Sequence, residues 1–232
     1  LFKKEGAKRS SVSYVISGKT SYLDQSSSVF YPYVETEFDG LPFSFTDIYG
    51  KLSSTATNGS NVNLFGFKFV DDVRISMGNR IGWDSQGMGF DFRAIPVASA
   101  LVLKGNLAYS NYAIEQQQSN GMPRSSSISG FNGGLDFTYY LRENDEFRYG
   151  FTAIGYRTDF RFSNQLGRTI SQTENTTELA GYFRYKADLG QRWLIEPGVH
   201  AHYYGSLSEF SLEPRIGMKY RANERFRIKA SG

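Results

Sequence analysis

Residues 210–232, FSLEPRIGMKYRANERFRIKASG, carry the pattern that decides the fold. Successive side chains of a β-strand point to opposite faces, so apolar–polar alternation predicts a strand with one apolar and one polar face. A short polar turn, 221–225, follows, and the alternation then resumes. The long strand, the short charged turn and the neighbouring aromatic residues favour a transmembrane β-barrel over a soluble sandwich, which stays open as the alternative. The alternating apolar positions of the first strand are Phe210, Leu212, Pro214, Ile216, Met218 and Tyr220.

The composition supports strands joined by turns within one domain, 1–232. The 232 residues include 24 Gly, 16 Tyr and 19 Phe but only 6 Pro, and there is no Cys for a disulfide or a thiolate metal site. No apolar run is long enough for a transmembrane helix, and a net charge of +3 gives no reason to expect a nucleic-acid partner. The chain starts at Leu1 without a signal peptide and stops within a strand pattern, so we expect part of a longer protein.

The same alternation along the chain predicts roughly eleven antiparallel strands. Loops are expected at 24–40, 117–127 and 164–173, and a further loop at 71–80, where the pattern is weak. The predicted strands cover about 9–22, 42–54, 62–70, a segment ending near Ile95, 101–116, 128–141, 147–163, 175–189, 193–204, 210–220 and a strand beginning at Arg225.

Two regularities favour an up-and-down barrel. Short connections at 55–61, 96–100, 142–146, 190–192 and 221–224 alternate with the longer loops, and 205–209 takes the place of a long loop. Outer-membrane barrels have short periplasmic turns and longer outer loops. Aromatic residues also flank the short turns, as expected for a girdle at the membrane–water interface. They are Phe137, Tyr139, Phe147, Tyr149, Tyr185, Trp193, Tyr220 and Phe226.

Three stretches resemble the TonB-dependent outer-membrane receptors, especially those of Bacteroidota. They are SVSYVISGKTSYLD (11–24), LPFSFTDIYGKL (41–52), and 177–204 together with 212–232, which include LEPR (212–215) and IKASG (228–232). The ordered series carries the resemblance. It implies a barrel of about 22 strands around a plug, of which this chain would hold roughly half, without the plug domain, the TonB box or the C-terminal strands.

The resemblance implies a transport function. A scarce solute, such as a ferric siderophore or another small ligand, would be imported across the outer membrane with energy delivered by TonB through the missing plug. The implied partners are outer-membrane lipids, TonB, the ligand and a surface lipoprotein or a barrel-assembly machine, with no cofactor. A passive porin, and a barrel segment held as a structural component or folding client of an assembly or secretion complex, remain alternatives, since open sheet edges need a partner in lipid. No catalytic constellation is present, so an enzyme is not expected.

Candidate site residues fall into three groups. His200 and His202 share a strand face with Glu196 and could bind a transition metal, although a polar lumen that holds water and contacts the plug also explains them, and explains them better. The acids Glu35, Glu37 and Asp39 lie in the predicted loop 24–40, where a substrate would first arrive, although a solvated loop explains them too. The third group should face the lumen and guide an anionic substrate or pair across strands: Lys51, Lys104, Glu178, Arg184, Lys186, Glu213, Arg215 and Lys219.

Overall fold

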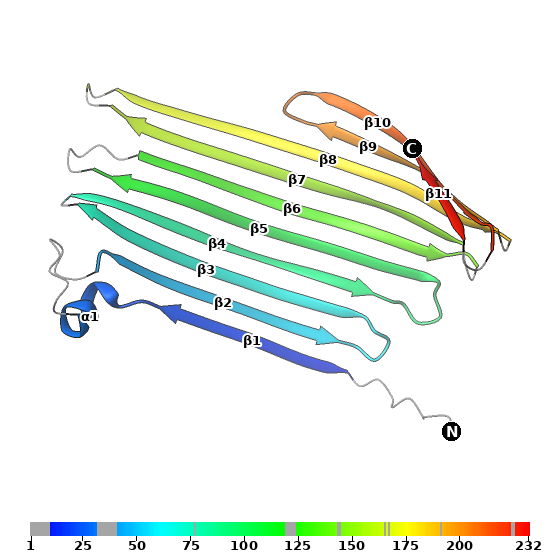
Figure 1. Ribbon diagram of the computed structural model, residues 1–232, viewed down its shortest axis with the longest axis horizontal. Coiled ribbons are helices and arrows are strands. Elements are labelled where there is room, and N and C mark those ends of the chain that lie inside the picture. The colour runs from blue at the N-terminus through cyan, green and yellow to red at the C-terminus, as the bar shows by residue number, and fades with distance from the viewer. Residues whose placement is uncertain are drawn as a thin grey trace.

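The computed structural model describes residues 10–31, 41–76, 78–118, 124–142, 145–164, 166, 168–190, 192–223 and 226–232. Within them the chain forms one antiparallel sheet of 11 strands and one short helix (Figure 1). The elements are β1 (Ser11–Thr20), α1 (Leu23–Phe30), β2 (Phe43–Thr55), β3 (Asn61–Ser76), β4 (Asn79–Ala94), β5 (Leu101–Gln117), β6 (Arg124–Tyr140), β7 (Glu146–Ser163), β8 (Thr169–Leu189), β9 (Trp193–Tyr204), β10 (Glu209–Arg221) and β11 (Arg227–Ser231).

Each strand pairs only with its neighbours in the chain, from β1 through to β11. The predicted antiparallel, up-and-down topology is therefore confirmed. The strands β1 and β11 form the two edges of an open sheet, on opposite sides of Figure 1. No helix in the described part of the chain is long and apolar enough to cross a membrane.

One face of the sheet, here called the outward face, carries a belt of exposed apolar side chains. The register aligns Leu107, Gly133, Ala153 and Leu179 across β5–β8. Among the described residues Ala187 is the one buried hydrophobic side chain, so no second layer covers this belt. A soluble sandwich would bury such a face, whereas a transmembrane strand exposes it to lipid.

Aromatic side chains line one edge of the belt, beside the tight turns. We call this part of the sheet the turn end and describe the sheet with the turn end at the bottom. Phe137 and Tyr149 stack with ring centroids 4.8 Å apart, and Phe147 stacks on Tyr185 at 4.5 Å. Trp193 packs against Tyr220 at 4.6 Å across the next hairpin. The predicted row of aromatic side chains flanking the short turns is thus present.

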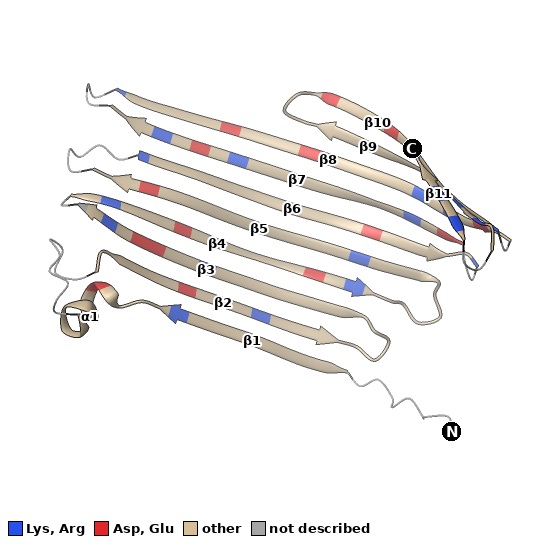
Figure 2. Cartoon of the chain, viewed as in Figure 1, with Lys and Arg blue, Asp and Glu red and all other residues tan. Residues whose placement is uncertain are grey.

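At its upper edge the belt ends abruptly along one row of the sheet. The row above this edge is polar on six successive strands, and the strands β3–β8 continue past it. These strands are 16 to 21 residues long, well beyond the about 9–11 residues that cross a bilayer. We call this part of the sheet the extended end. It lies on the left of Figure 2, where charged residues are spread along β3, β4 and β7. The polar row consists of Lys68, Gln86, Asn111, Ser129, Arg157 and Asn175.

The extended end corrects the predicted loops. The loop predicted at 71–80 is wrong, because β3 runs to Ser76, β4 starts at Asn79, and Gly78 turns the chain with a φ of 80°. The predicted loops 117–127 and 164–173 are too long, because β6 starts at Arg124 and β8 at Thr169. Above the belt both faces of a strand can be polar, so the alternation that marks a strand disappears there. The expected contrast between long and short connections is consequently lost, except at 21–42.

The helix α1, Leu23–Phe30, overlaps the first part of the predicted loop 24–40 and was not expected. Asp24 stands in its first turn, and the Ser26 hydroxyl donates a hydrogen bond to the Tyr22 carbonyl oxygen at 2.8 Å. Ser27 is buried and its hydroxyl oxygen accepts a hydrogen bond from the backbone N–H of Leu41 at 2.6 Å. This bond fixes the helix beside the start of β2.

The belt contains two glycines in one row that make a matched test of packing. A Cβ at Gly105 would lie 2.6 Å from Leu135 Cδ2 and 2.7 Å from Phe92 Cζ, whereas one at Gly181 meets nothing closer than 3.8 Å. We expect Gly105→Ala to lower the free energy of unfolding by about 1–2 kcal/mol, because the neighbouring side chains must move. Gly181→Ala should leave it within about 0.5 kcal/mol. Urea titration in lipid vesicles measures both, and equal effects would contradict this packing.

Candidate functional site

The face opposite the belt, the polar face, is the candidate functional surface. The register places all the predicted lumen charges on it, together with His200. The register pairs Lys104 with Asp136 in one row of this face. In a second row it aligns Tyr182, His200 and Glu213. The prediction that these charges share one face is confirmed. A polar inner face is what a barrel presents to its lumen.

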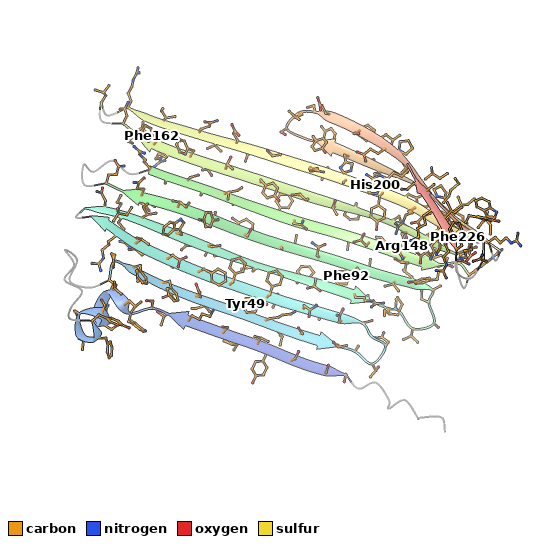
Figure 3. All side chains as sticks on the ribbon, in the orientation of Figure 1. Tyr49, Phe92, Arg148, Phe162, His200 and Phe226 are labelled. Atoms are coloured by element: carbon orange, nitrogen blue, oxygen red, sulfur yellow. The ribbon has the colours of Figure 1, made fainter. Side chains whose placement is uncertain are left out.

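At the turn end, where Figure 3 labels Arg148, the polar face carries ion pairs within and between strands. Glu146, only 6% exposed, accepts from Arg148 at 2.7 Å and lies 3.8 Å from the Lys186 ammonium. Arg184 pairs with Glu196 at 2.8 Å. Of the predicted lumen charges, Arg184 and Lys186 therefore pair across strands, as one of the two predictions stated, whereas Glu213 and Arg215 pair within β10.

Asp188 and Asp145 form a second group of acidic side chains at the turn end. Arg221 donates to the Asp188 carboxylate at 3.2 Å, and the Asp145 carboxylate accepts the backbone N–H of Asp188 at 2.8 Å. Asp145 is buried, so the turn that follows β6 is tied to β8. These contacts hold the lower wall of the lumen at a fixed register.

The two histidines lie on the polar face of β9, near the β11 edge of the sheet. Their rings stack at 6.1 Å, and Tyr182 and Tyr204 continue the stack at 5.4 and 6.2 Å. His202 Nδ1 lies 3.0 Å from Glu178 Oε1. Glu196 pairs with Arg184 instead of joining them. Within the described ranges no group of three or more His, Asp or Glu side chains is placed to hold a metal ion, so the metal site at His200 and His202 stays a prediction without a third ligand.

An aromatic hollow of about 500 Å³ opens at the extended end of the polar face. The register aligns Phe45, Asp71 and Trp83 in one row on neighbouring strands. Aromatic rings bind flat apolar groups, and a carboxylate among them can accept hydrogen bonds or attract a cation. The side chains of this face that line the hollow are Phe43, Phe45, Asp71, Val73, Trp83 and Tyr112.

The sequence prediction missed this hollow because Asp71 fell in the predicted loop 71–80, so it could not be aligned with Phe45 and Trp83. Apolar and charged residues occur on both faces at Val70, Asp71, Asp72 and Val73, so no alternation marked this part of β3 as a strand. The predicted substrate-binding acids Glu35, Glu37 and Asp39 lie outside the described residues and remain a prediction.

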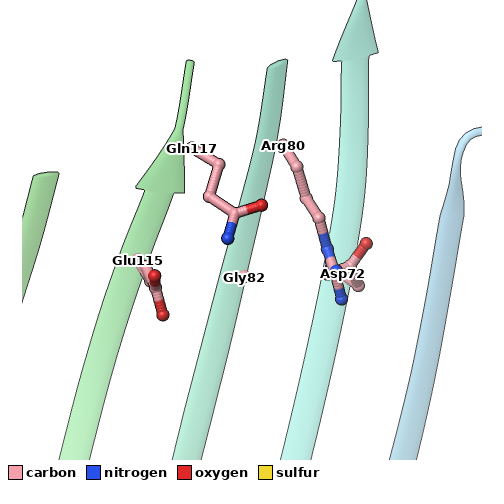
Figure 4. A pocket seen from close by; sticks show the side chains of 5 residues that line it. All are labelled: Asp72, Arg80, Gly82, Glu115 and Gln117. Carbon is pink, nitrogen blue, oxygen red and sulfur yellow. Dashed lines mark hydrogen bonds and ion pairs between the residues drawn. The ribbon is translucent and has the colours of Figure 1, made fainter. Parts of the chain in front are cut away.

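A smaller hollow of about 150 Å³ lies on the outward face, above the belt (Figure 4). Asp72 and Arg80 form an ion pair there, and Glu115 stands across Gly82 from them. Since this hollow faces away from the lumen, it is separate from the candidate ligand surface.

Comparison with known proteins identifies the fold. No protein-family model and no curated protein sequence matches the chain. The hemophore receptor HasR from Serratia marcescens, solved with its hemophore HasA and heme, is similar over 97% of this chain and 41% of its own, with a TM-score of 0.54 and 10% identity. The siderophore receptor PiuA from Acinetobacter baumannii is similar over 99% of this chain and 42% of its own, with a TM-score of 0.50 and 7% identity. The chain has the fold of an outer-membrane β-barrel.

The outer-membrane transporter YddB from Escherichia coli also matches, over 91% of this chain and 36% of its own, with a TM-score of 0.48 and 10% identity. The chain thus spans about two fifths of the length of these proteins. At their low identities, the similarity to HasR and PiuA establishes the fold alone.

Proposed function

We propose that this chain forms part of the barrel of an outer-membrane receptor that imports a small ligand with energy delivered through TonB. The observation that carries the proposal is the aromatic hollow around Asp71 and Trp83, at the outer end of a polar lumen wall. A surface that only shields a water-filled pore has no need of clustered aromatic rings. The fold shared with a hemophore receptor and a siderophore receptor supports the same reading.

In this proposal the sheet is one part of a larger closed barrel. The backbone groups along the free edges of β1 and β11 have no partner strand among the described residues. Lipid cannot satisfy such groups, so further strands must pair with both edges in the membrane. The ion pairs around Glu146 then form the lumen wall at the turn end, which is the end from which TonB would reach the plug.

The ligand class follows from the hollow. Flat aromatic groups stack on Trp83 and Tyr112, and the Asp71 carboxylate accepts hydrogen bonds from ligand hydroxyl groups. A ferric siderophore fits these requirements when, besides its aromatic iron-binding groups, it keeps hydroxyl, amide or ammonium groups that are not bound to iron and can donate to Asp71. Other small ligands with an aromatic body fit them as well, and a passive flow of ions does not use them.

Iron uptake by living cells tests the proposal. The full-length protein is expressed in cells without other siderophore receptors, and uptake of iron-55 bound to a catecholate siderophore is followed with and without TonB. We expect uptake that requires TonB and falls about tenfold in Trp83→Ala, since one aromatic contact contributes roughly that much binding energy. Trp193→Ala, which removes the other tryptophan from the outward face, is the control, with uptake divided by the amount of folded protein.

Two results would overturn the proposal. Uptake that continues without TonB, together with free ion conductance in planar bilayers, would show a passive porin. Absence of uptake, with the protein recovered mainly in a complex with barrel-assembly components, would show a folding client.

A further inference from the structure

A second hollow on the outward face lies on the upper edge of the belt. It encloses about 150 Å³ on β5–β8. Its lower row contains Tyr109, Phe131 and Gly155, and the row above contains Ser129, Arg157 and Asn175. The Phe131 ring lies flat over Gly155, where a Cβ would come within 2.7 Å of its Cζ atom. The hollow thus joins an aromatic, apolar floor to a polar rim.

The rim is rich in hydrogen-bond donors. Asp159 accepts from Arg157 Nε at 2.8 Å and Nη2 at 3.1 Å, and from the Thr173 hydroxyl at 2.6 Å. These bonds hold the pKa of the Asp159 carboxyl below its usual range, so the carboxylate stays charged and fixes the guanidinium. The two bonds from Arg157 to Asp159 use Nε and Nη2 and not Nη1, and the register places Ser129 and Asn175 next to Arg157 on the neighbouring strands. Guanidinium, hydroxyl and amide groups are typical partners of phosphate and sugar oxygens.

The polar part of the outward face also extends over several rows above the belt. Above Arg157 the next outward positions on β6–β8 carry Ser127, Asp159 and Thr173, and then Ser125, Arg161 and Ser171. From Arg157 to Arg161 the strand rises about 14 Å, or about 11 Å along the membrane normal at the usual tilt. A phospholipid headgroup layer is only about 5–8 Å thick. A headgroup made of several sugars reaches the whole of this surface.

The hollow of Figure 4 makes a useful contrast. It lies on the same face, but two carboxylates, Asp72 and Glu115, line it beside the single Arg80, whereas Arg157 lines the hollow on β5–β8 without a carboxylate in that lining. An anionic headgroup is repelled there by the two carboxylates. The hollow around Arg157 is therefore the better site for an anion.

We propose that the hollow formed by Tyr109, Phe131, Gly155, Ser129, Arg157 and Asn175 binds a phosphorylated glycolipid of the outer leaflet. An acyl chain packs on Phe131 and Tyr109, the phosphate accepts from Arg157, and the sugars contact the hydroxyl-bearing positions of β6 and β8. The inference rests on the proposed outer-membrane location and not on ligand import.

Lipid titration of the purified protein tests this site. The full-length protein in a mild detergent is titrated with lipid A bearing two phosphates, with phosphatidylglycerol and with phosphatidylcholine, and binding is followed by native mass spectrometry. We expect lipid A to bind at least about tenfold more tightly than either phospholipid, and Arg157→Gln to remove most of that difference. Lys68→Gln is the matched control, since Lys68 lies in the same polar row and is likewise paired with an acid, Asp84, but is outside the hollow.

A second variant keeps the test decisive if Arg157→Gln fails to fold. Ser129→Asp places a carboxylate in the rim and should weaken lipid A binding about as much, through repulsion of the phosphate. Equal binding of all three lipids, preference for phosphatidylglycerol, or an equal loss in Lys68→Gln would each overturn the assignment. None of these results depends on iron uptake, so failure here leaves the proposed transport function untouched.

Discussion

Replacing Phe151 with arginine is expected to lower the free energy of unfolding in lipid vesicles by about 2–4 kcal/mol, the usual cost of a charge at the bilayer midplane on a barrel strand. Phe151 is the central outward position of β7, between Leu135 and Gly181 in one row, and more than half of its side chain is exposed. Nothing in the described protein covers it, so the arginine would meet hydrocarbon. Urea titration in phosphatidylcholine vesicles measures the loss.

The neighbouring residue supplies the control. Thr152 lies on the polar face, so Thr152→Arg should cost less than about 1 kcal/mol, because its charge reaches the lumen. If the two arginine variants were equally unstable, the assignment of outward and polar faces would be wrong.

Removing the Glu146 carboxylate is expected to have the second large effect. Glu146→Ala leaves Arg148 and Lys186 without their shared anion, next to Arg184 across the strand pair. Breaking a buried pair costs about 3–5 kcal/mol. Since the Arg148 and Lys186 side chains are 40% and 32% exposed, we expect about 2 kcal/mol here. Urea titration at low and high salt measures it, and the loss should shrink at high salt.

Glu213 provides the comparison for this effect. It pairs with Arg215 at 2.6 Å on the same strand, and both side chains are about half exposed. Glu213→Ala should therefore destabilise the protein clearly less than Glu146→Ala does. An equal loss in the two variants would show that burial of Glu146 contributes nothing.

The strands inside the belt could be predicted from sequence, and those above it could not. Alternation marks a strand only where one face meets an apolar medium. It is strong in Phe210–Tyr220 and in 131–141, which lie in the belt, and the strand of 193–204 was predicted with its observed bounds. In β8 the outward-facing residues from Thr169 to Thr173 are polar, and they were assigned to a loop.

The candidate site was only partly predictable for the same reason. The face of each lumen charge follows from alternation along a single strand, so Lys51, Glu178 and Arg215 were placed correctly. The hollow around Trp83 depends on the register between β2, β3, β4 and β5, which a single strand does not contain. The hollow around Arg157 depends in addition on the level at which the belt ends.

The strictly sequential strand order has a kinetic consequence. Because every strand pairs with its nearest neighbours in the chain, each pairing closes only a short loop, and the entropy lost on closure is small. Folding rates rise as contacting residues become closer in sequence. The sheet can therefore grow one hairpin at a time, and a strand that joins at β1 or β11 meets a template that is already ordered.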